Sequence, residues 1–147
     1  PNIITSLELD PAEMEKRNIH LQKKYAEIEE NEVRFEELHC EDAEYLIVAF
    51  GSCARIAQKA MEIAREEGIK VGLLRPITLW PFPSKAIAAR AAQVKGILTV
   101  ELNAGQMVED VRLAVECKVP VEHFGRLGGI VPDPDEVITA LKEKLIK

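Results

Sequence analysis

The sequence predicts a three-layer α/β/α fold, in which a mostly parallel β-sheet is covered by helices on both faces. Four short apolar runs have the length and β-branched content of buried strands, and they lie at 46–50, 69–74, 96–100 and 119–123. Each run is followed by a segment whose apolar residues recur at three- and four-residue spacing, as in amphipathic helices. This regular alternation of strand and helix is typical of parallel sheets built from βαβ units.

Composition restricts the class of protein. The chain has 147 residues, 47% of them hydrophobic and 30% charged, as expected for one domain with an additional segment. Its formal net charge of −6 argues against a nucleic-acid surface. No apolar stretch reaches the roughly 18 residues of a membrane span, and no signal peptide is evident. Cys40, Cys53 and Cys117 are odd in number and widely spaced, which predicts neither disulfides nor a metal site and favours the cytoplasm.

The first 31 residues are expected to form an N-terminal segment and a linker helix. Pro1 replaces an initiator Met, which indicates a piece of a longer polypeptide. Asp10-Pro11-Ala12-Glu13 has the pattern of a helix start with a capping box. The helix should continue to Glu30, with a thin apolar stripe of Met14, Leu21, Tyr25 and Ile28. Such a stripe suits a linker packed along another domain or subunit, and equally a solvated helix lying on its own domain.

The α/β domain is expected to span residues 32–147. The segment from Glu27 to Glu44 contains nine acidic residues and one Arg, and this excess of negative charge predicts a solvated connection. Within it, residues 32–36 alternate as in a short edge strand. The unit at 45–68 then combines a buried strand, a Gly51-Ser52 turn and a helix that Gly68 ends.

The helix start after Gly51-Ser52 exposes backbone N–H groups that can hold an anion or polar ligand. The sequence there is neither G-x-G-x-x-G nor a Walker A loop, so a dinucleotide or triphosphate is not expected.

The rest of the chain repeats this pattern. Arg75–Pro83 contains three prolines within eight residues, which excludes regular structure, and Ser84 should N-cap the next helix. Pro120 falls at a strand start, and residues 124–129 form a glycine-rich turn. The expected buried helix faces are Ile87, Ala91 and Val94; Met107, Val111, Ala114 and Val115; and Val137, Ile138, Leu141 and Leu145.

The unusual motifs all follow strands and should therefore meet at the C-terminal edge of the sheet, where open α/β folds bind ligands. The cofactor-binding or interface candidates are Gly51, Ser52, Arg55, Arg75, Glu101, Asn103, Gln106 and Arg126. Helix caps and turns would explain the glycines and Ser52, but not so many charged and amide side chains at one edge. The alternative is that these polar residues only satisfy loop backbones.

A catalytic set does not emerge from the sequence. Cys53, near a helix start, could have a lowered thiol pKa, although a small residue beside a tight turn is more often inert. Glu101 could act as an acid or base, but a capping or salt-bridged role is commoner. His123 has no second His or Cys at metal-ligand spacing, so no metal is expected.

Trp80 and Phe82, set among prolines, predict an interface with another chain or domain.

Four motifs together resemble one family: AFGSCAR, LLRPITLWPFP, VELNAGQM and HFGRLGG. They are similar to the C-terminal domain of the α subunit of 2-oxoacid:ferredoxin oxidoreductases, of the 2-oxoglutarate and ketoisovalerate types. The resemblance covers about residues 40–140. It implies the fold of the transketolase C-terminal domain, with one antiparallel strand that residues 32–38 could supply.

For the complete enzyme the resemblance implies thiamine diphosphate, Mg²⁺ and iron–sulfur clusters, with ferredoxin and coenzyme A as partners. The N-terminal domain of the same subunit and a β subunit would complete it. The resemblance implies that this chain is a non-catalytic domain that binds no cofactor alone and contributes to assembly, with an edge that borders the approach of coenzyme A. Two alternatives are a stand-alone module that binds a small anion or nucleotide and the matching domain of another thiamine enzyme.

Overall fold

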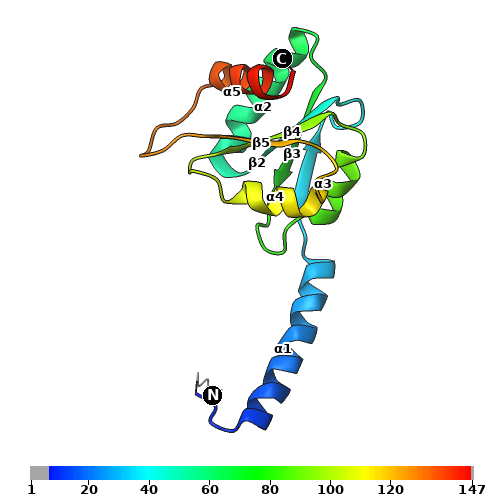
Figure 1. Cartoon of the computed structure of the whole chain (residues 1–147), viewed down its shortest axis with the longest axis vertical. Coiled ribbons are helices and arrows are strands. Elements are labelled where there is room, and N and C mark those ends of the chain that lie inside the picture. Colours follow the sequence, from blue (N-terminus) through cyan, green and yellow to red (C-terminus); the bar gives the residue numbers. More distant parts are fainter. Residues whose placement is uncertain (1–6, 147) are drawn as a thin grey trace.

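Five strands form one mixed sheet in the computed structural model, which describes residues 7–146 (Figure 1). The order across the sheet is β1-β3-β2-β4-β5, with β1 antiparallel to β3 and the other pairs parallel. The strands are β1 (Phe35–Leu38), β2 (Tyr45–Ala49), β3 (Val71–Pro76), β4 (Gly96–Glu101) and β5 (Val121–Gly125). The predicted mostly parallel sheet is confirmed. Its one antiparallel strand, β1, falls within the expected segment 32–38, although it starts at Phe35 and not at residue 32.

Helices cover both faces of the sheet, as predicted. The covering helices are α2 (Gly51–Glu66), α3 (Ser84–Ala91), α4 (Met107–Val115) and α5 (Pro134–Leu141), which a short π-helix, η1 (Lys142–Ile146), extends; a further helix, α1 (Pro11–Asn31), precedes the sheet. The α2 and α5 helices pack on one face, and α3 and α4 on the other (Figure 1). None of these helices is long and apolar enough to cross a membrane.

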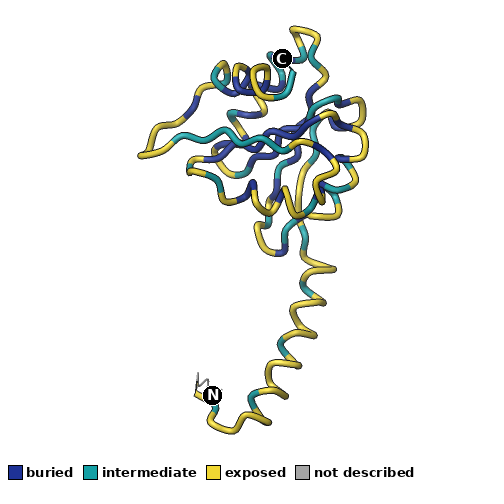
Figure 2. Tube along the Cα trace, viewed as in Figure 1, coloured by how far each residue is buried: buried dark blue, intermediate teal, exposed yellow. Residues whose placement is uncertain are grey.

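The central strand β2 is buried on both faces because its side chains alternate between the two cores. Ile47 and Ala49 join the core under α2 and α5, whereas Leu46 and Val48 join the core over α3 and α4. Figure 2 shows this buried centre in dark blue. The positions expected to be buried on the last three helices are buried, except that Ala114 and Leu145 are only half-buried. Val108 and Ala140 are buried in addition.

Several predicted boundaries are wrong by one or two residues. Gly51 and Ser52 are already in α2: Phe50 alone separates the helix from β2, and Gly51 accepts the φ of +57° at this sharp transition. Ser84 is likewise the first helical residue, and Pro83 takes the N-cap position. The end of α2 is as predicted, with Gly68 at a φ of +85°.

The strands β3 and β5 both extend farther toward the C-terminus than predicted, because their last residues pair with a neighbouring strand. β3 starts at Val71 and continues through Arg75 and Pro76, because these two residues pair with β1. β5 starts after Pro120 and includes Phe124 and Gly125, since both pair with β4. The predicted glycine-rich turn therefore begins only at Arg126.

The helix α1 projects away from the sheet (Figure 1) and contains no buried residue (Figure 2). Asp10 caps it by accepting from the N–H groups of Ala12 and Glu13 at 2.8 and 3.3 Å. The Glu13 carboxylate pairs with Lys16 at 2.6 Å instead of closing the predicted capping box. The alternative in which this helix lies on its own domain is wrong: among the described residues, the α/β domain meets it near its C-terminal end, through Trp80, Lys85 and their neighbours (Figure 1).

The edge strand β1 is joined to α3 by one ion pair. The Arg90 guanidinium donates to both carboxylate oxygens of Glu37, at 2.8 and 2.6 Å. The two side chains are 23% and 22% exposed, so solvent screens the pair only in part. The hydrogen bond from Arg90 holds the pKa of Glu37 below its usual range.

Replacing Arg90 with Met should lower the free energy of unfolding at pH 7 by about 1–2 kcal/mol. Because the pKa of Glu37 is lower in the folded state, the pair stabilises the fold above the ordinary Glu pKa of about 4.3 and loses its effect as the pH falls below that value. Urea unfolding from pH 7 to pH 3 should therefore show a stability difference between variant and parent that shrinks toward acid. A difference that is independent of pH would contradict this origin.

Candidate functional site

The C-terminal ends of the four parallel strands lie at one edge of the sheet, as predicted. The chain leaves β2 toward α2 on one face and leaves the neighbouring β4 toward α4 on the other face. The order of connections therefore reverses between β2 and β4. Such a switch point is where open α/β sheets bind ligands.

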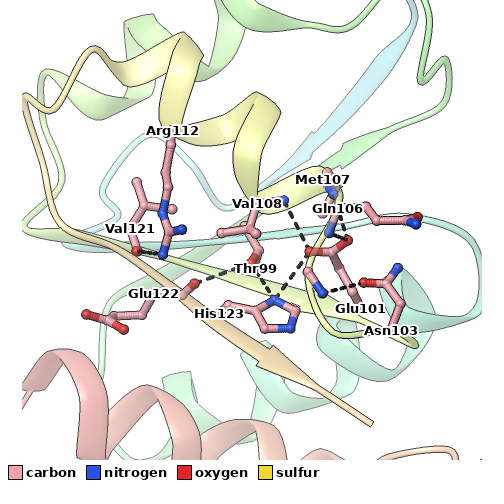
Figure 3. Close-up of polar contacts among 11 residues, drawn as sticks. Thr99, Glu101, Asn103, Gln106, Met107, Val108, Arg112, Val121, Glu122 and His123 are labelled. Atoms are coloured by element: carbon pink, nitrogen blue, oxygen red, sulfur yellow. Dashed lines mark hydrogen bonds and ion pairs between the residues drawn. The ribbon is translucent and has the colours of Figure 1, made fainter. Parts of the chain in front are cut away.

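Glu101, the last residue of β4, is the polar centre of this edge. Its side chain is fully buried, and it accepts three backbone hydrogen bonds (Figure 3). The donors are the N–H groups of Gln106 at 3.1 Å, Met107 at 2.8 Å and Val108 at 3.1 Å. These are the first N–H groups of α4, at the positive end of the helix dipole. The N-terminus of α4 is thus occupied by a carboxylate of the chain itself.

His123 lies beside this carboxylate on β5 (Figure 3). Its Nδ1 atom is 3.3 Å from Oε2 of Glu101 and 3.3 Å from Oγ1 of Thr99. The Thr99 hydroxyl donates to the Glu122 carbonyl at 3.3 Å, so its oxygen is left to accept. With two acceptors facing it, Nδ1 carries the ring proton in this arrangement. The His123 side chain is 21% exposed, and the network therefore reaches the surface.

The loop between β4 and α4 is held tightly against β5. The Asn103 side-chain oxygen accepts from the Gly105 N–H at 2.7 Å, which closes a small turn. Gly125 lies directly beside this turn: a Cβ atom there would be 2.2 Å from the Asn103 carbonyl oxygen and 2.6 Å from Nε2 of His123. The close approach of loop and strand therefore requires glycine at position 125.

The structure brings together four of the eight predicted site residues. Glu101, Asn103 and Gln106 belong to one turn, and the Arg126 N–H joins them by donating to the Glu101 carbonyl at 3.2 Å. The Arg126 side chain points elsewhere and pairs with Glu136 at 2.8 Å.

The other four candidates lie across the switch point or beyond it. Gly51, Ser52 and Arg55 form the exposed first turn of α2, where Phe50 provides no side-chain cap. Arg75 is farther along the sheet and pairs with Glu36 on β1 at 2.8 Å. The edge thus has two different helix starts, one closed by Glu101 and one without a side-chain cap.

Cys53, on α2, faces the interior of the domain. Burial raises the pKa of its thiol, and the negative charge of Glu101 raises it further. The predicted alternative of a thiol activated by the helix start is therefore wrong. Burial likewise raises the pKa of Cys40 to about 11. Both side chains are protonated packing groups at neutral pH.

The described residues do not fit a metal centre. Within 7–146 no three His, Cys, Asp or Glu side chains are grouped so that they could hold a metal ion. An iron–sulfur cluster requires thiolates, usually four. The chain has three cysteines, and Cys40 and Cys53 lie in separate cores as protonated thiols. An iron–sulfur cluster therefore cannot be assigned to these side chains.

The two predicted interface residues differ in their surroundings. Phe82 is half-buried and packs against the core of α3 and α4. Trp80 is 55% exposed, and its ring meets Tyr25 of α1 edge-on, with centroids 5.7 Å apart. Both residues line a groove of about 540 Å³ between the end of α1 and the proline-rich segment.

Thr99 and His123 are the residues that sequence reasoning missed. Thr99 and Glu101 lie two apart on β4, and His123 and Gly125 lie two apart on β5, so all four face α4. The two-residue alternation along β4 and β5 is therefore the sequence signal that could have identified this group of residues. The predicted β5 ended at His123 and left Gly125 in a turn, so the alternation along β5 was not recognised.

Solved structures define the class of fold. The chain matches a split-gene transketolase, an inactive β4 tetramer, with a TM-score of 0.65 over 77% of this chain and 41% of that one. At 20% identity this likeness shows the fold alone. The chain thus has an open α/β fold like that of this transketolase domain.

The family follows from closer matches. The model of the family described as pyruvate:ferredoxin oxidoreductase core domain II matches residues 43–137, and the chain belongs to this family. Ketoisovalerate oxidoreductase subunit VorB of Methanothermobacter thermautotrophicus is 49% identical over 97% of this chain. A 2-oxoglutarate:ferredoxin oxidoreductase from Magnetococcus marinus, with 2-oxoglutarate, coenzyme A and succinyl-CoA bound, matches with a TM-score of 0.79 at 26% identity, over 92% of this chain and 24% of that one. The chain spans 40% of the length of VorB.

Proposed function

We propose that this chain is the C-terminal domain of the α-type subunit of a 2-oxoacid:ferredoxin oxidoreductase of the ketoisovalerate type. The complete enzyme would oxidatively decarboxylate a branched-chain 2-oxoacid, transfer the acyl group to coenzyme A and pass the electrons to ferredoxin. One observation carries the proposal: the 49% identity to VorB extends over 97% of the chain, including α1, which lies outside the residues 43–137 of the family model.

Within such an enzyme the domain would have a supporting role. Glu101 is used to hold α4, and Cys53 is a protonated packing residue, which supports a non-catalytic assignment. Thiamine diphosphate, Mg²⁺ and the clusters would be held by the N-terminal domain, the β subunit and other parts of the assembly, in the cytoplasm.

The edge would border the approach of coenzyme A. The phosphate groups of coenzyme A are anions. The first turn of α2 offers backbone N–H groups that no side chain caps, and these can bind an anion. Arg55 follows on the same exposed turn and adds a cation that suits phosphate. The opposite helix start, closed by Glu101, would repel the same ligand, so the α2 side of the switch point is the favoured side.

A chimeric subunit tests the proposal. This chain would replace the matching segment of VorB in the Methanothermobacter thermautotrophicus enzyme, and reduction of ferredoxin would be followed with ketoisovalerate or 2-oxoglutarate, with and without coenzyme A. We expect an assembled enzyme that requires coenzyme A and prefers ketoisovalerate. Because the recipient subunits would hold the cofactors, the informative outcome is assembly, and failure of a folded chimera to assemble would refute the proposed role.

Replacing Trp80 with Ala should weaken assembly more than folding. The side chain is 55% exposed and contributes one aromatic contact within the chain, worth about 0.5–1.5 kcal/mol. We therefore expect a small fall in melting temperature and about a tenfold weaker association with the remaining subunits. Phe82→Ala is the matched control, and it should lower the melting temperature more because Phe82 packs on the core. A larger thermal effect from Trp80→Ala would contradict the interface role.

A further inference from the structure

The segment between β5 and α5, residues 126–132, forms an arm that projects from the α/β domain (Figure 1). Its tip is a tight turn, in which the Ile130 N–H donates to the Leu127 carbonyl at 3.3 Å. Gly128 and Gly129 occupy the two central positions with φ values of +65° and +83°, and a type I′ turn requires positive φ at both. The conformation of the tip is therefore specified by its own glycines.

Both ends of the arm are fixed to the domain. At one end the Arg126 N–H donates to the Glu101 carbonyl at 3.2 Å, and the Arg126 guanidinium pairs with Glu136 of α5 at 2.8 Å. At the other end Pro132 is buried, and Asp133 caps α5 by accepting from the Glu136 N–H at 2.8 Å. A short segment with a specified turn and two fixed ends is preorganised for contact with a partner.

The arm carries apolar side chains that its own domain does not cover. Leu127, Ile130 and Val131 are between 52% and 60% exposed, and in the described part of the chain neither core includes them. The tip is open as well, since a Cβ atom added at Gly128 or Gly129 would meet no described atom within 4 Å. Figure 2 shows the whole tip as exposed. Neighbouring exposed apolar side chains of this kind mark a contact site.

Charge restricts what can cover the arm. Residues 127–132 contain no ionisable side chain, and the flanking Arg126 and Asp133 are engaged within the chain. A phosphate-bearing ligand or a nucleic acid would therefore gain no ionic contact here, and the surface that fits the arm is apolar. The first turn of α4, which lies beside β5, and the first turn of α5 carry exposed acidic residues, namely Glu109, Asp110, Asp133 and Asp135. The apolar patch is thus small and isolated.

The small size of the patch indicates where its partner lies. Two separate proteins usually bury about 1,200–2,000 Å² when they associate stably, which is far more than three side chains supply. Surfaces on one polypeptide meet at a high effective concentration, so a small apolar contact is sufficient between tethered domains. The chain spans 40% of the length of VorB, and a subunit of that length has room for a companion domain.

We infer that the arm is an anchor that inserts into an apolar pocket on the remaining part of the same subunit. The inference rests on the proposed function, because it requires this chain to be one domain of a VorB-like subunit.

Hydrogen exchange followed by mass spectrometry tests this contact in the chimeric subunit, in which this chain replaces the matching segment of VorB. The subunit is measured alone, before other subunits or coenzyme A are added. The backbone amides of the arm should exchange about a hundredfold more slowly there than in the 147-residue chain, as expected when two large apolar side chains are buried. Protection that is absent, or that appears only after other subunits or coenzyme A are added, would overturn the inference. The readout requires neither assembly nor activity, so its failure is distinguishable from failure of the proposed function.

Substitutions in the arm give the second measurement. Leu127→Ser combined with Ile130→Ser should leave the melting temperature of the 147-residue chain unchanged, because neither side chain is packed in it. In the chimeric subunit the same change should return the exchange of the arm to the rate of the chain alone. Leu113→Ser, at a 77% exposed leucine of α4, is the matched control and should alter neither measurement. A fall in melting temperature of the chain itself with the double variant would show that the arm serves its own domain and would overturn the inference.

Discussion

Glu101→Ala is expected to lower the free energy of unfolding by about 3–5 kcal/mol, which is a large part of the stability of a domain this size. The carboxylate accepts three N–H groups at the start of α4, and two of the donors, those of Met107 and Val108, belong to buried residues. Alanine leaves these donors without an acceptor and also removes the negative charge that the helix dipole favours. Urea unfolding followed by circular dichroism measures the change.

Two further variants separate these contributions. Glu101→Gln retains one acceptor oxygen but turns an amide NH₂ toward an N–H donor, so we expect a smaller loss of about 2 kcal/mol. Glu109→Ala removes an exposed acidic residue from the same first turn of α4 and should change stability by less than about 0.5 kcal/mol. If Glu101→Ala were no more harmful than Glu109→Ala, the capping role of Glu101 would be refuted.

The architecture could be predicted because it rests on local patterns. The buried run of β2 and the three- and four-residue spacing of α2 are visible in any short window of the sequence. The shared edge followed from topology, since parallel strands place their C-terminal ends together. Even the thin stripe of α1 was apparent, and the structure adds that the helix projects from the sheet.

What the sequence left open depends on contacts between distant segments. Arg75 looks like a site residue by its place after an apolar run, yet β1 pairs with this segment and Glu36 neutralises the charge. Cys53 stands at a helix start, where a low thiol pKa is common, but burial raises the pKa of its thiol and the Glu101 carboxylate raises it further. In both cases the deciding contacts come from segments tens of residues away, and a single sequence does not reveal them.

The position of the candidate site at the C-terminal edge of the sheet was thus predicted, but its hydrogen bonds were not. Glu101 was considered as an acid, a base or a cap, and only its geometry toward Gln106, Met107 and Val108 selects the cap. Once that group is assigned to the fold, the uncapped turn of α2 is the part of the edge left for a ligand. We therefore propose the α2 side of the edge, and not the whole edge, for the contact with coenzyme A.

Gly125→Ala is expected to destabilise the domain by about 3 kcal/mol, the upper end of the usual overpacking range. The added methyl would lie 2.2 Å from the carbonyl oxygen of Asn103, a backbone atom that can move only if the loop between β4 and α4 moves with it. It would also lie 2.6 Å from Nε2 of His123. We therefore expect the urea midpoint to fall and the imidazole resonances of His123 to shift in NMR spectra.

Gly96→Ala is the matched control, because it adds the same methyl at the start of the neighbouring strand β4. There the nearest atom, at 2.7 Å, is Cδ2 of Leu145, the end of a flexible side chain near the C-terminus. That side chain can rotate away, and the expected loss is below about 1 kcal/mol. Equal losses for the two variants would show that backbone crowding does not explain Gly125. A much larger loss at Gly125, with His123 perturbed only there, would show that this strand glycine holds the loop and the histidine in place by its lack of a side chain.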